Sequence, residues 1–489
     1  MALGRTADAQ VSVDCNSNPS ALQSAVASNT PGTSFAITGL CQGTVSVGTS
    51  LALLNHLGSD TLQTSDGIQG ELVITGSALV LIDGITLEGT ASDTGLPDIL
   101  EVLGTPTVGI ENSRIINGQR MGLNINGGAT VVIANTTISG NGIAHVAGQS
   151  DGISAVSAAI LLGGTNSDGS VDPTQAVTIA NNFGNGIGLF GHGHLAMAGG
   201  IIQNNGGNQA FLAGASDLEL VGTQVFQNQT PSMPGAFAIQ ALGGSTVGLF
   251  SGSVVSGGGV AGAVLVASAG SLFMNGALLA NTSLSVPTIQ ISGSSNGVLG
   301  GGNTIQNTQS GGTVLQIDHA SSFQQVGLAG YMPELLAGIH IAPAPDSLSG
   351  SAFVQEQSQF DIGMGTISGN PSLTWSVPAG NCILVQQNSS LRLSGGVTIS
   401  GAAPSACALN GNAVSSTITI QQESNGFFNL SQGGLDEIDG GGNVACAFAG
   451  MPNAHVTGKA NISPAAAQPV VIGSLAAALN ATSPGCLGP

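Results

Sequence analysis

Residues 131–141 read Val-Val-Ile-Ala-Asn-Thr-Thr-Ile-Ser-Gly-Asn, and the same phrase returns along most of the chain. Each copy has a short apolar strand, a turn, two apolar residues and then Asn or Gly. The other copies start at positions 80, 108, 195, 218, 247, 272, 298, 360 and 391. Most successive starts are separated by one short repeat, and the intervals from 131 to 195 and from 298 to 360 are longer. A repeat of this length, with short strands and no helical period, predicts one coil of a parallel β-helix.

The repeat therefore predicts an all-β fold, a single right-handed parallel β-helix (a solenoid) from about residue 46 to 445. One coil cannot bury its inward side chains alone, so the coils must stack and share one core. Asn recurs at the turn of the repeat because Asn and Gly tolerate the left-handed backbone that a tight turn needs. We expect these Asn side chains to be structural and to stack as a ladder of amides. They are Asn117, Asn141, Asn204, Asn228, Asn281, Asn307 and Asn370.

Composition supports this fold and excludes several classes of protein. The 489 residues include 77 Gly and only 6% charged residues, with 5 Lys and Arg against 25 Asp and Glu. Five basic residues cannot form the basic surface that binds nucleic acid. A 42% share of apolar residues excludes a disordered chain, and Gly does not recur at every third position as collagen requires. The favoured residues, Gly, Ser, Thr, Asn and Val among them, are typical of strands and turns.

The N-terminal end should be capped, because a solenoid exposes unpaired strand edges at its ends. We expect an N-terminal extension at residues 1–14 and an N-terminal cap at 15–45. The cap should contain a short helix, Pro19–Ala27, with Asn18 as its N-cap. The strand-like Gln10–Asp14 should pair either with its own β-helix or with the edge of a neighbouring copy.

Two further departures from the repeat lie toward the C-terminus. Residues 326–350 break the pattern, and we expect a loop or short helix inserted in the β-helix there. Residues 446–489 should form a C-terminal cap, with a second short helix at Ser474–Asn480. The insertion is either a contact loop or a segment with its own small core.

Six cysteines lie near the two ends of the chain. An even number clustered in this way favours disulfides in a secreted protein over reduced thiols in a cytosolic one. The sequence Ala-Asp-Ala at residues 7–9 matches a signal-peptidase site, although no apolar segment precedes it. We therefore expect a secreted or cell-surface location. Pairing nearest neighbours gives one of the fifteen connectivities that six cysteines allow, namely Cys15–Cys41, Cys382–Cys407 and Cys446–Cys486.

The most apolar stretch, Val260–Ala280, has the length of a membrane-spanning helix and no charged residue. Gly, Ser and Asn interrupt it, and its apolar residues alternate in short bursts. Two strands and a turn explain this pattern better than one helix. We expect no membrane span.

The N-terminal cap, followed by Pro-Gly-Thr-Ser-Phe-Ala-Ile-Thr-Gly-Leu-Cys at residues 31–41 and then by Asn-rich coils, resembles secreted right-handed parallel β-helix proteins. That superfamily includes pectate lyases, polygalacturonases, and many adhesins and passenger domains. The resemblance covers nearly the whole chain. It implies the fold and secretion but leaves the function open, because this fold hosts many activities.

Polygalacturonases carry Asn-Thr-Asp, Asp-Asp, Gly-His-Gly and Arg-x-Lys motifs on successive coils. This chain resembles that pattern in part, through Asp151, Asp172 and His192, which follow one another at intervals close to one coil. The resemblance implies that Asp151 and Asp172 share the acid and base roles of a glycoside hydrolase, assisted by His192. One Asp of the pair and the whole basic motif are missing. The other interpretation is that all three are solvated turn residues.

Other enzyme chemistry of the superfamily fits less well. Its lyases need Arg or Lys to abstract a proton and offset uronate charge, and no Arg or Lys lies between Arg120 and Arg392. Carbohydrate sites often use stacking Trp and Tyr, and the chain has only Trp375 and Tyr331. We expect no pectate lyase activity.

Two patterns could bind a metal. His192 and His194 are two residues apart and can face the same way on a strand, but no third ligand is evident nearby. Asp436, Asp439 and Asn443 offer oxygen ligands for Ca²⁺ but lack the spacing and closing Glu of a known calcium loop. We assign no metal site and expect no cofactor.

The most informative absence lies between Glu219 and Asp318. The intervening segment, residues 220–317, which we call the uncharged belt, contains no Asp, Glu, Lys, Arg or His. A soluble monomer normally distributes charges over such a surface, whereas the cores of protein interfaces are depleted of charge. The belt therefore predicts protein–protein contact rather than catalysis.

These features favour a secreted structural protein over an enzyme. We expect a β-helical subunit that associates with copies of itself in an extracellular fibre, surface layer or adhesin. Two alternatives stay open: a polysaccharide hydrolase of polygalacturonase-like plan and a phage-type receptor-binding spike. The expected partners are copies of the chain, a cell surface or a polysaccharide, and not nucleic acid.

Overall fold

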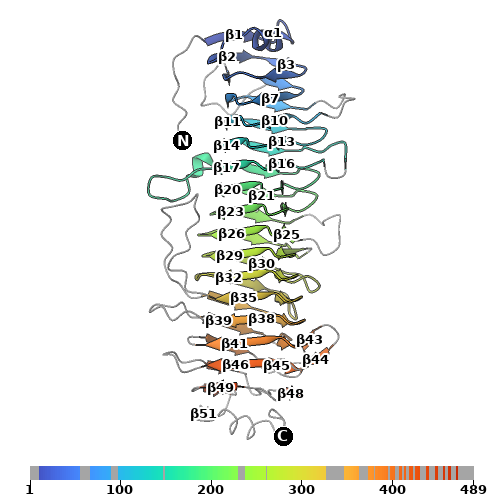
Figure 1. Cartoon of the computed structure of the whole chain (residues 1–489), viewed down its shortest axis with the longest axis vertical. Coiled ribbons are helices and arrows are strands. Elements are labelled where there is room, and N and C mark those ends of the chain that lie inside the picture. The colour runs from blue at the N-terminus through green and yellow to red at the C-terminus, as the bar shows by residue number, and fades with distance from the viewer. Residues whose placement is uncertain are drawn as a thin grey trace. The chain divides into compact units, whose positions relative to one another are not determined.

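The structure is a computed structural model, and it divides the chain into two compact units, residues 1–232 and 233–489. Each unit is a parallel solenoid in which a coil contributes one strand to each of three sheets (Figure 1). The expected all-β parallel β-helix is therefore confirmed. Beyond residue 391 the structure describes the backbone of the strands alone. Side chains are described for residues 10–55, 66–89, 97–146, 149–228, 237–259, 261–325, 346–362, 373–378 and 380–391.

The chain visits the sheets in the order sheet 1, sheet 2, sheet 3. In the first unit, sheet 1 contains β1 (Gln10–Asp14), β2 (Thr33–Thr38), β5 (Leu51–Asn55), β8 (Leu79–Asp83), β11 (Thr107–Glu111), β14 (Thr130–Ala134), β17 (Ala159–Gly163), β20 (His194–Ala198) and β23 (Asp217–Val221). Sheet 2 contains β3 (Leu40–Gln42), β6 (Gly67–Gln69), β9 (Thr86–Glu88), β12 (Arg114–Ile116), β15 (Thr137–Ser139), β18 (Thr178–Ala180), β21 (Ile201–Gln203) and β24 (Gln224–Phe226). Sheet 3 contains β4 (Val45–Val47), β7 (Leu72–Gly76), β10 (Leu100–Gly104), β13 (Leu123–Asn126), β16 (Ile153–Val156), β19 (Ile187–Phe190) and β22 (Ala210–Ala213).

The second unit repeats this plan. Its sheet 1 contains β26 (Thr246–Phe250), β29 (Ser271–Asn275), β32 (Asn296–Leu299), β35 (Ser322–Gln325), β38 (Gln359–Ile362), β41 (Ser390–Ser394), β46 (Asn425–Asn429) and β49 (His455–Thr457). Sheet 2 contains β27 (Val254–Ser256), β30 (Leu278–Asn281), β33 (Thr304–Asn307), β36 (Asp346–Ser349), β39 (Leu373–Val377), β42 (Val397–Gly401), β47 (Glu437–Asp439), β50 (Asn461–Ser463) and β51 (Val470–Val471). Sheet 3 contains β25 (Phe237–Ala241), β28 (Gly262–Val266), β31 (Ile289–Ile291), β34 (Thr313–Ile317), β37 (Ser351–Val354), β40 (Ile383–Val385), β45 (Ile418–Gln421) and β48 (Ala447–Ala449). A separate antiparallel pair joins β43 (Cys407–Leu409) to β44 (Asn412–Val414).

Each coil buries one side of every strand, because side chains alternate in direction along a strand. In β14, Val131 and Ile133 are fully buried while Val132 between them faces outward. The parallel register then places similar inward residues above one another, and each such buried side chain contributes roughly 1.5–3 kcal/mol to stability. One column of sheet 1 consists of Val80, Val108, Val131, Ile160, Leu195 and Leu218.

Buried amides line the turn between sheet 2 and sheet 3 in the first unit. Asn141 donates from Nδ2 to Oδ1 of Asn182 at 2.8 Å, and Asn182 donates from Nδ2 to Oδ1 of Asn205 at 2.9 Å. Asn205 in turn donates from Nδ2 to Oε1 of Gln209 at 2.7 Å. All four side chains are buried. An amide ladder therefore joins successive coils here, as the repeat predicts.

Asn141 belongs to the ladder as expected, but its other Asn members, Asn182 and Asn205, were not among the residues expected. Asn117 and Asn204 have backbone φ angles of 61° and 55°, so they are the left-handed turn residues. The amide side chains that point inward belong to the residue after the left-handed one. This is because the side chains at these two neighbouring positions of the turn point in different directions. In the second unit, Asn281 and Asn307 donate to backbone carbonyl oxygens instead of to other amides. Asn370 lies outside the described residues.

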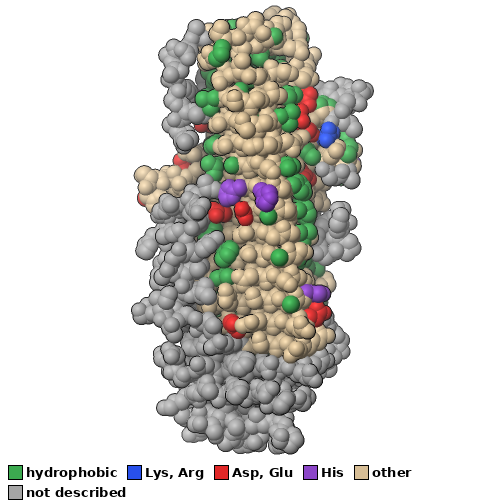
Figure 2. Space-filling view, viewed as in Figure 1, with side chains coloured by type: hydrophobic (Ala, Val, Ile, Leu, Met, Phe, Trp, Pro, Cys, Tyr) green, Lys and Arg blue, Asp and Glu red, His purple; other side chains and the backbone are tan. Residues whose placement is uncertain are grey.

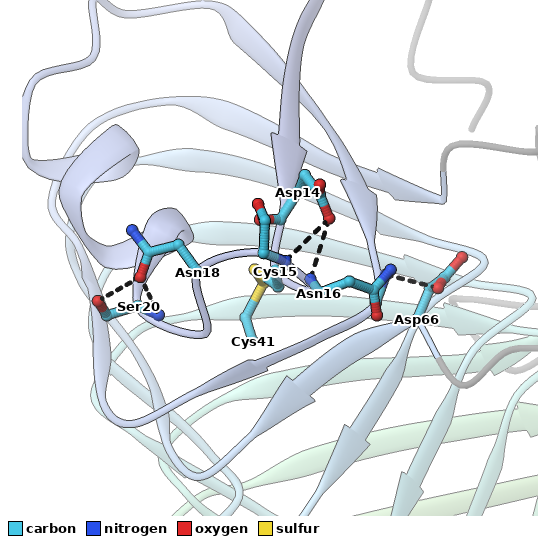
Figure 3. The surroundings of a disulfide bond; sticks show 9 residues. Asp14, Cys15, Asn16, Asn18, Ser20, Cys41 and Asp66 are labelled. Carbon is cyan, nitrogen blue, oxygen red and sulfur yellow. Dashed lines mark hydrogen bonds between the residues drawn. A yellow bond between two sulfur atoms is a disulfide. The ribbon is translucent and has the colours of Figure 1, made fainter.

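A disulfide between Cys15 and Cys41 joins the first strands at the N-terminal end, as predicted (Figure 3). The bonded cysteines flank α1 (Ala21–Ala27), which buries Leu22 and Val26. Cys382 is also disulfide-bonded. The side chains of its expected partner Cys407 and of the expected pair Cys446–Cys486 lie outside the described residues.

The N-terminal helix is shorter than expected. It begins at Ala21 rather than Pro19, and Ser20 is its N-cap, without a side-chain capping bond. Asn18 lies two residues before this N-cap, and its Oδ1 accepts hydrogen bonds from the backbone N–H and the hydroxyl of Ser20, at 3.2 and 3.0 Å. The Asn18 side chain thus closes a local turn around Pro19 just before the helix.

The N-terminal strand lies on its own solenoid. β1 pairs in parallel with β2, in register from Gln10 opposite Ser34 to Asp14 opposite Thr38. Strands β2 and β3 fall within the range 15–45, and β4 begins at its last residue, Val45. All three already pair with the strands of the next coil.

The two expected features near the C-terminus are only partly described. Within the expected insertion at 326–350, β36 pairs with β33 as an ordinary coil strand. The rest of the insertion, residues 326–345, and the expected helix Ser474–Asn480 lie outside the described residues. In the part of the chain that is described, no helix has the length and apolar character needed to cross a membrane.

Candidate functional site

Asp151 lies in the turn before β16 and is almost fully buried, with 3% of its surface exposed. The backbone N–H of Asn185, on the next coil, donates to its Oδ1 at 2.8 Å. Burial raises the pKa of Asp151 to about 6, although its hydrogen bonds with Asn185 act in the opposite direction. A Cβ added to Gly184 or Gly188 would lie only 2.5 or 2.6 Å from its carboxylate oxygens. The next coil therefore encloses this carboxylate.

The same bond recurs on other coils at the position of Asp151. Oδ1 of Asp98 accepts the backbone N–H of Met121 at 3.1 Å, and Oδ1 of Asn185 accepts that of Asn208 at 2.9 Å. Each of these side chains holds the backbone of the next coil. Asp151 is thus one member of a structural column along the turn from sheet 2 to sheet 3.

Asp172 lies in the loop between β17 and β18, where it caps a short 3₁₀ helix, η1 (Pro173–Gln175). It accepts hydrogen bonds from the backbone N–H of Thr174 at 2.9 Å and from Nε2 of Gln175 at 3.0 Å. Two hydrogen bonds from Thr174 lower the pKa of Asp172, and the bond from its hydroxyl has a larger effect than the bond from its backbone N–H. This carboxylate is organised as a helix cap.

His192 lies exposed in the turn between β19 and β20, with a φ of 69°. Asp151, Asp172 and His192 therefore occupy three different turns of the coil: sheet 2 to 3, sheet 1 to 2, and sheet 3 to 1. The structure does not bring these three residues together on one face.

A patch of histidine and carboxylate side chains lies on sheet 1 of the first unit. His194 in β20 is opposite Asp217 in β23, and Glu219 follows on the same side of β23. Figure 2 shows histidines and carboxylates side by side on one face of the molecule. Nevertheless, no group of three or more His, Cys, Asp or Glu side chains that could hold a metal ion occurs in the described part of the chain.

The candidate calcium ligands cannot be placed. Asp436 and Asn443 lie outside the described residues. Asp439 ends β47, for which only the backbone is described.

The aromatic side chains differ in exposure. Trp375 is fully buried and donates from Nε1 to the carbonyl oxygen of Gly350 at 3.1 Å. Tyr331 lies outside the described residues. Phe183, in a turn from sheet 2 to sheet 3, is 49% exposed, and its ring centroid is 3.4 Å from that of His145. In the sequence, the signal for this exposed apolar side chain was a Phe that directly follows two Asn residues in a turn.

A hydrogen-bonded group of titratable side chains lies in the second unit. His319 Nδ1 is 2.9 Å from Oδ1 of Asp318, and Nε2 is 3.1 Å from Oε2 of Glu356 on the next coil. The other oxygen of Asp318 accepts from Nε2 of Gln290 and Gln316, at 3.1 and 2.7 Å. The bond to Asp318 and the negative charges of Asp318 and Glu356 raise the pKa of His319 above its ordinary value of 6.5.

This arrangement predicts a pH-dependent contribution of His319 to stability. A raised pKa means that the stabilisation is complete below about pH 6.5 and is lost as the pH rises through the raised value. His319→Gln should lower the thermal unfolding midpoint at pH 5.5 and change it less at pH 8.5. Thermal unfolding followed by circular dichroism at the two pH values measures this. His192→Gln, in an exposed turn of the first unit, is the control, and an equal effect at both pH values would contradict the prediction.

The described part of the uncharged belt in the second unit presents neutral side chains on all three sheets. The outward column of sheet 2 contains Ser256, Ala280 and Gln306, which are in register. Leu284, in the turn after β30, is 61% exposed, more than any other large apolar side chain in the described residues. This surface offers apolar and polar contacts but no acid, base or ion pair.

No protein-family model matches the chain, and no curated protein matches it. The geometry above is therefore the basis for assigning a function.

Proposed function

We propose that this chain is a secreted structural protein that associates with copies of itself, as a subunit of an extracellular fibre, surface layer or adhesin. The observation that carries this proposal is the uncharged belt with the exposed Leu284 at its surface. Interface cores are depleted of charge and are more apolar than the rest of the surface. An association of this type should bury at least about 1,000 Å².

The distribution of charge supports contact between copies at the belt. The chain has a formal net charge of −20, and none of its charged residues lies between positions 220 and 317. Two copies repel one another through their other surfaces, and this repulsion is weakest where the charges are absent. The belt is thus the surface along which identical copies approach at the least electrostatic cost.

Secretion is supported by the Cys15–Cys41 disulfide. Disulfides form and persist mainly in oxidising compartments. A disulfide that joins the first coils also suits a protein whose ends must remain folded outside the cell.

Lysine substitutions in the belt test the proposal. The double variant Leu284→Lys/Gln306→Lys places two positive charges on each copy at the expected contact, so that identical surfaces repel. We expect the concentration needed for assembly to rise by at least about tenfold, which corresponds to about 1.4 kcal/mol. Analytical ultracentrifugation across a dilution series measures this, with circular dichroism to confirm that the solenoid is folded.

The matched control is Phe183→Lys/Thr178→Lys in the first unit. It changes an exposed apolar residue in the corresponding turn and an outward residue of sheet 2, but both lie outside the belt. Equal assembly of the belt variant and the control would contradict the role of the belt. A parent chain that stays monomeric at high concentration would contradict the structural proposal itself, and discrete trimers would favour the receptor-binding spike.

The hydrolase alternative draws little support from the geometry, because Asp151 is enclosed and Asp172 is a helix cap in another turn. It has a direct test. Release of reducing sugar from an acidic polysaccharide, abolished by Asp151→Asn, would replace the structural proposal with that activity.

A further inference from the structure

The first strand of sheet 1 has an open edge at the N-terminal end of the chain. The first strands of the other two sheets are covered there: helix α1 lies against β4 in sheet 3, and the carbonyl oxygen of Pro19 accepts the backbone N–H of Gln42 in β3 of sheet 2, at 2.7 Å. In contrast, β1 pairs with β2 and with no other strand in the described part of the chain (Figure 1).

Backbone groups of β1 point toward this open edge. The N–H of Cys15 donates to the carbonyl oxygen of Thr38, toward β2, at 2.8 Å. Because backbone groups alternate in direction along a strand, those of Val11 and Val13 also point toward β2, while Ser12 points its N–H and C=O toward the open edge. The neighbours of Ser12 on the same side, Gln10 and Asp14, point the same way.

The edge lacks the devices that normally prevent strand addition. Exposed edges are usually protected by charged side chains, Pro or a bulge. The sequence from Gln10 to Val13 contains neither a charged residue nor Pro, and its pairing with β2 is regular. Val11 lies on the inward side, in register with the buried Phe35, yet it is 41% exposed because no strand follows β1 on its open side.

The N-terminal end is also almost free of charge, like the belt. Residues 15–55 contain no Asp, Glu, Lys, Arg or His, and only Arg5, Asp8 and Asp14 are charged before them, in a chain with a net charge of −20. The exposed side chains of α1 are neutral: Gln23, Ser24 and Ala27. Two such ends can therefore approach with little repulsion, and depletion of charge is typical of the cores of interfaces.

We propose that β1 pairs antiparallel with β1 of a second copy, so that two copies join head to head through sheet 1. A two-fold axis relates the copies, so both use the same surface and the contact closes as a dimer. This inference goes beyond the proposed function and does not depend on the uncharged belt.

The sequence of β1 is self-complementary when Ser12 lies opposite Ser12 of the partner. This register pairs the whole of β1, and the two Ser12 residues exchange backbone hydrogen bonds. The exposed Val11 then lies opposite Val13 of the partner and gains an apolar cross-strand contact. The two Asp14 carboxylates are about 14 Å apart along the strands, and each lies opposite Gln10 of the partner, whose amide can donate to it. Apolar groups and charges are both accommodated by this one register.

Cysteine cross-linking tests the register. Ser12→Cys places one thiol from each copy beside the two-fold axis, with Cα atoms about 5.5 Å apart, which is within the range of a disulfide. We expect this variant to form a covalent dimer under mild oxidation, measured by non-reducing electrophoresis and by mass spectrometry of the joined peptide. The matched control is Gln10→Cys, on the same side of β1, whose Cα atoms would be about 14 Å apart and which should stay uncross-linked. Equal cross-linking of the two variants, or none in Ser12→Cys, overturns the proposal.

A proline variant tests the backbone bonds. Ser12→Pro removes the N–H that faces the open edge and leaves the bonds to β2 in place, and Pro is tolerated on such edges. We expect the unfolding midpoint of the parent but a dissociation constant of the dimer that is at least about tenfold higher, measured by analytical ultracentrifugation. Ser12→Ala keeps the N–H and should dimerise like the parent. Equal dimerisation of Ser12→Pro and Ser12→Ala would contradict the strand pairing.

The belt variant Leu284→Lys/Gln306→Lys separates this inference from the proposed function. Dimers that Ser12→Pro dissociates and the belt variant does not would support head-to-head pairing and contradict the role of the belt. Dimers that only the belt variant dissociates would place the contact at the belt and overturn the pairing of β1. A parent chain that stays monomeric at high concentration overturns both.

Discussion

Asn182→Ala is expected to lower the free energy of unfolding by about 4 kcal/mol. Oδ1 of Asn182 accepts both the backbone N–H and the Nδ2 hydrogen of Asn141, at 3.1 and 2.8 Å. Its own Nδ2 donates to Oδ1 of Asn205 and to the carbonyl oxygen of Ile138. Truncation removes the acceptor of the buried backbone N–H of Asn141 and of one of its Nδ2 hydrogens, and it creates a small cavity between coils. Denaturant unfolding followed by circular dichroism measures the loss.

Asn181→Gly is the matched control for this variant. Asn181 is the neighbouring residue, is exposed, and has a φ of 57° that glycine adopts without strain. We expect its unfolding midpoint to lie close to that of the parent. If Asn182→Ala and Asn181→Gly unfold at the same denaturant concentration, the buried ladder does not stabilise the coils.

Asp151→Asn is expected to stabilise the protein at pH 8 and to have little effect near pH 4. Burial raises the pKa of Asp151 from 3.8 to about 6. Between these values the folded chain binds a proton that the unfolded chain has lost, so the stability of the parent falls as the pH rises from about 4 to 6. Above that window the ionised carboxylate costs about 3 kcal/mol, a cost that a neutral amide does not have. An amide at position 151 can still accept the N–H of Asn185 through its oxygen.

Unfolding midpoints of the parent and Asp151→Asn at pH 4, 6 and 8 test this expectation. The control is Asp172→Asn, because the bonds from Thr174 lower rather than raise the pKa of Asp172. A lowered pKa contributes stability at neutral pH that is lost on acidification, so this variant should be no more stable than the parent at pH 8. A difference between parent and Asp151→Asn that does not change with pH would show that the carboxylate is not held in the buried environment described here.

Sequence periodicity determined the fold class, because the inward side chains repeat with the length of the coil. Val108 and Val131 start successive copies of the phrase, and they are in direct register on neighbouring strands. The sequence also indicated the Cys15–Cys41 disulfide, since these two cysteines are nearest neighbours in the chain. These features depend on local sequence patterns, and the stacking of coils places equivalent residues of successive patterns next to one another.

Only the tertiary structure decided which side chains meet across coils. The spacing between Asp151 and Asp172 is close to one ordinary coil of the repeat, but β16 pairs with β19 only after a longer coil. The extra residues form the loop that contains Asp172. Asp172 therefore lies in a turn from sheet 1 to sheet 2, whereas Asp151 lies in a turn from sheet 2 to sheet 3. In a similar way His319 meets Glu356 on the next coil, although residues 326–345 separate their strands in the sequence. The length of each turn sets where a side chain emerges around the coil, and turn lengths vary at little cost in stability because they lie outside the shared core.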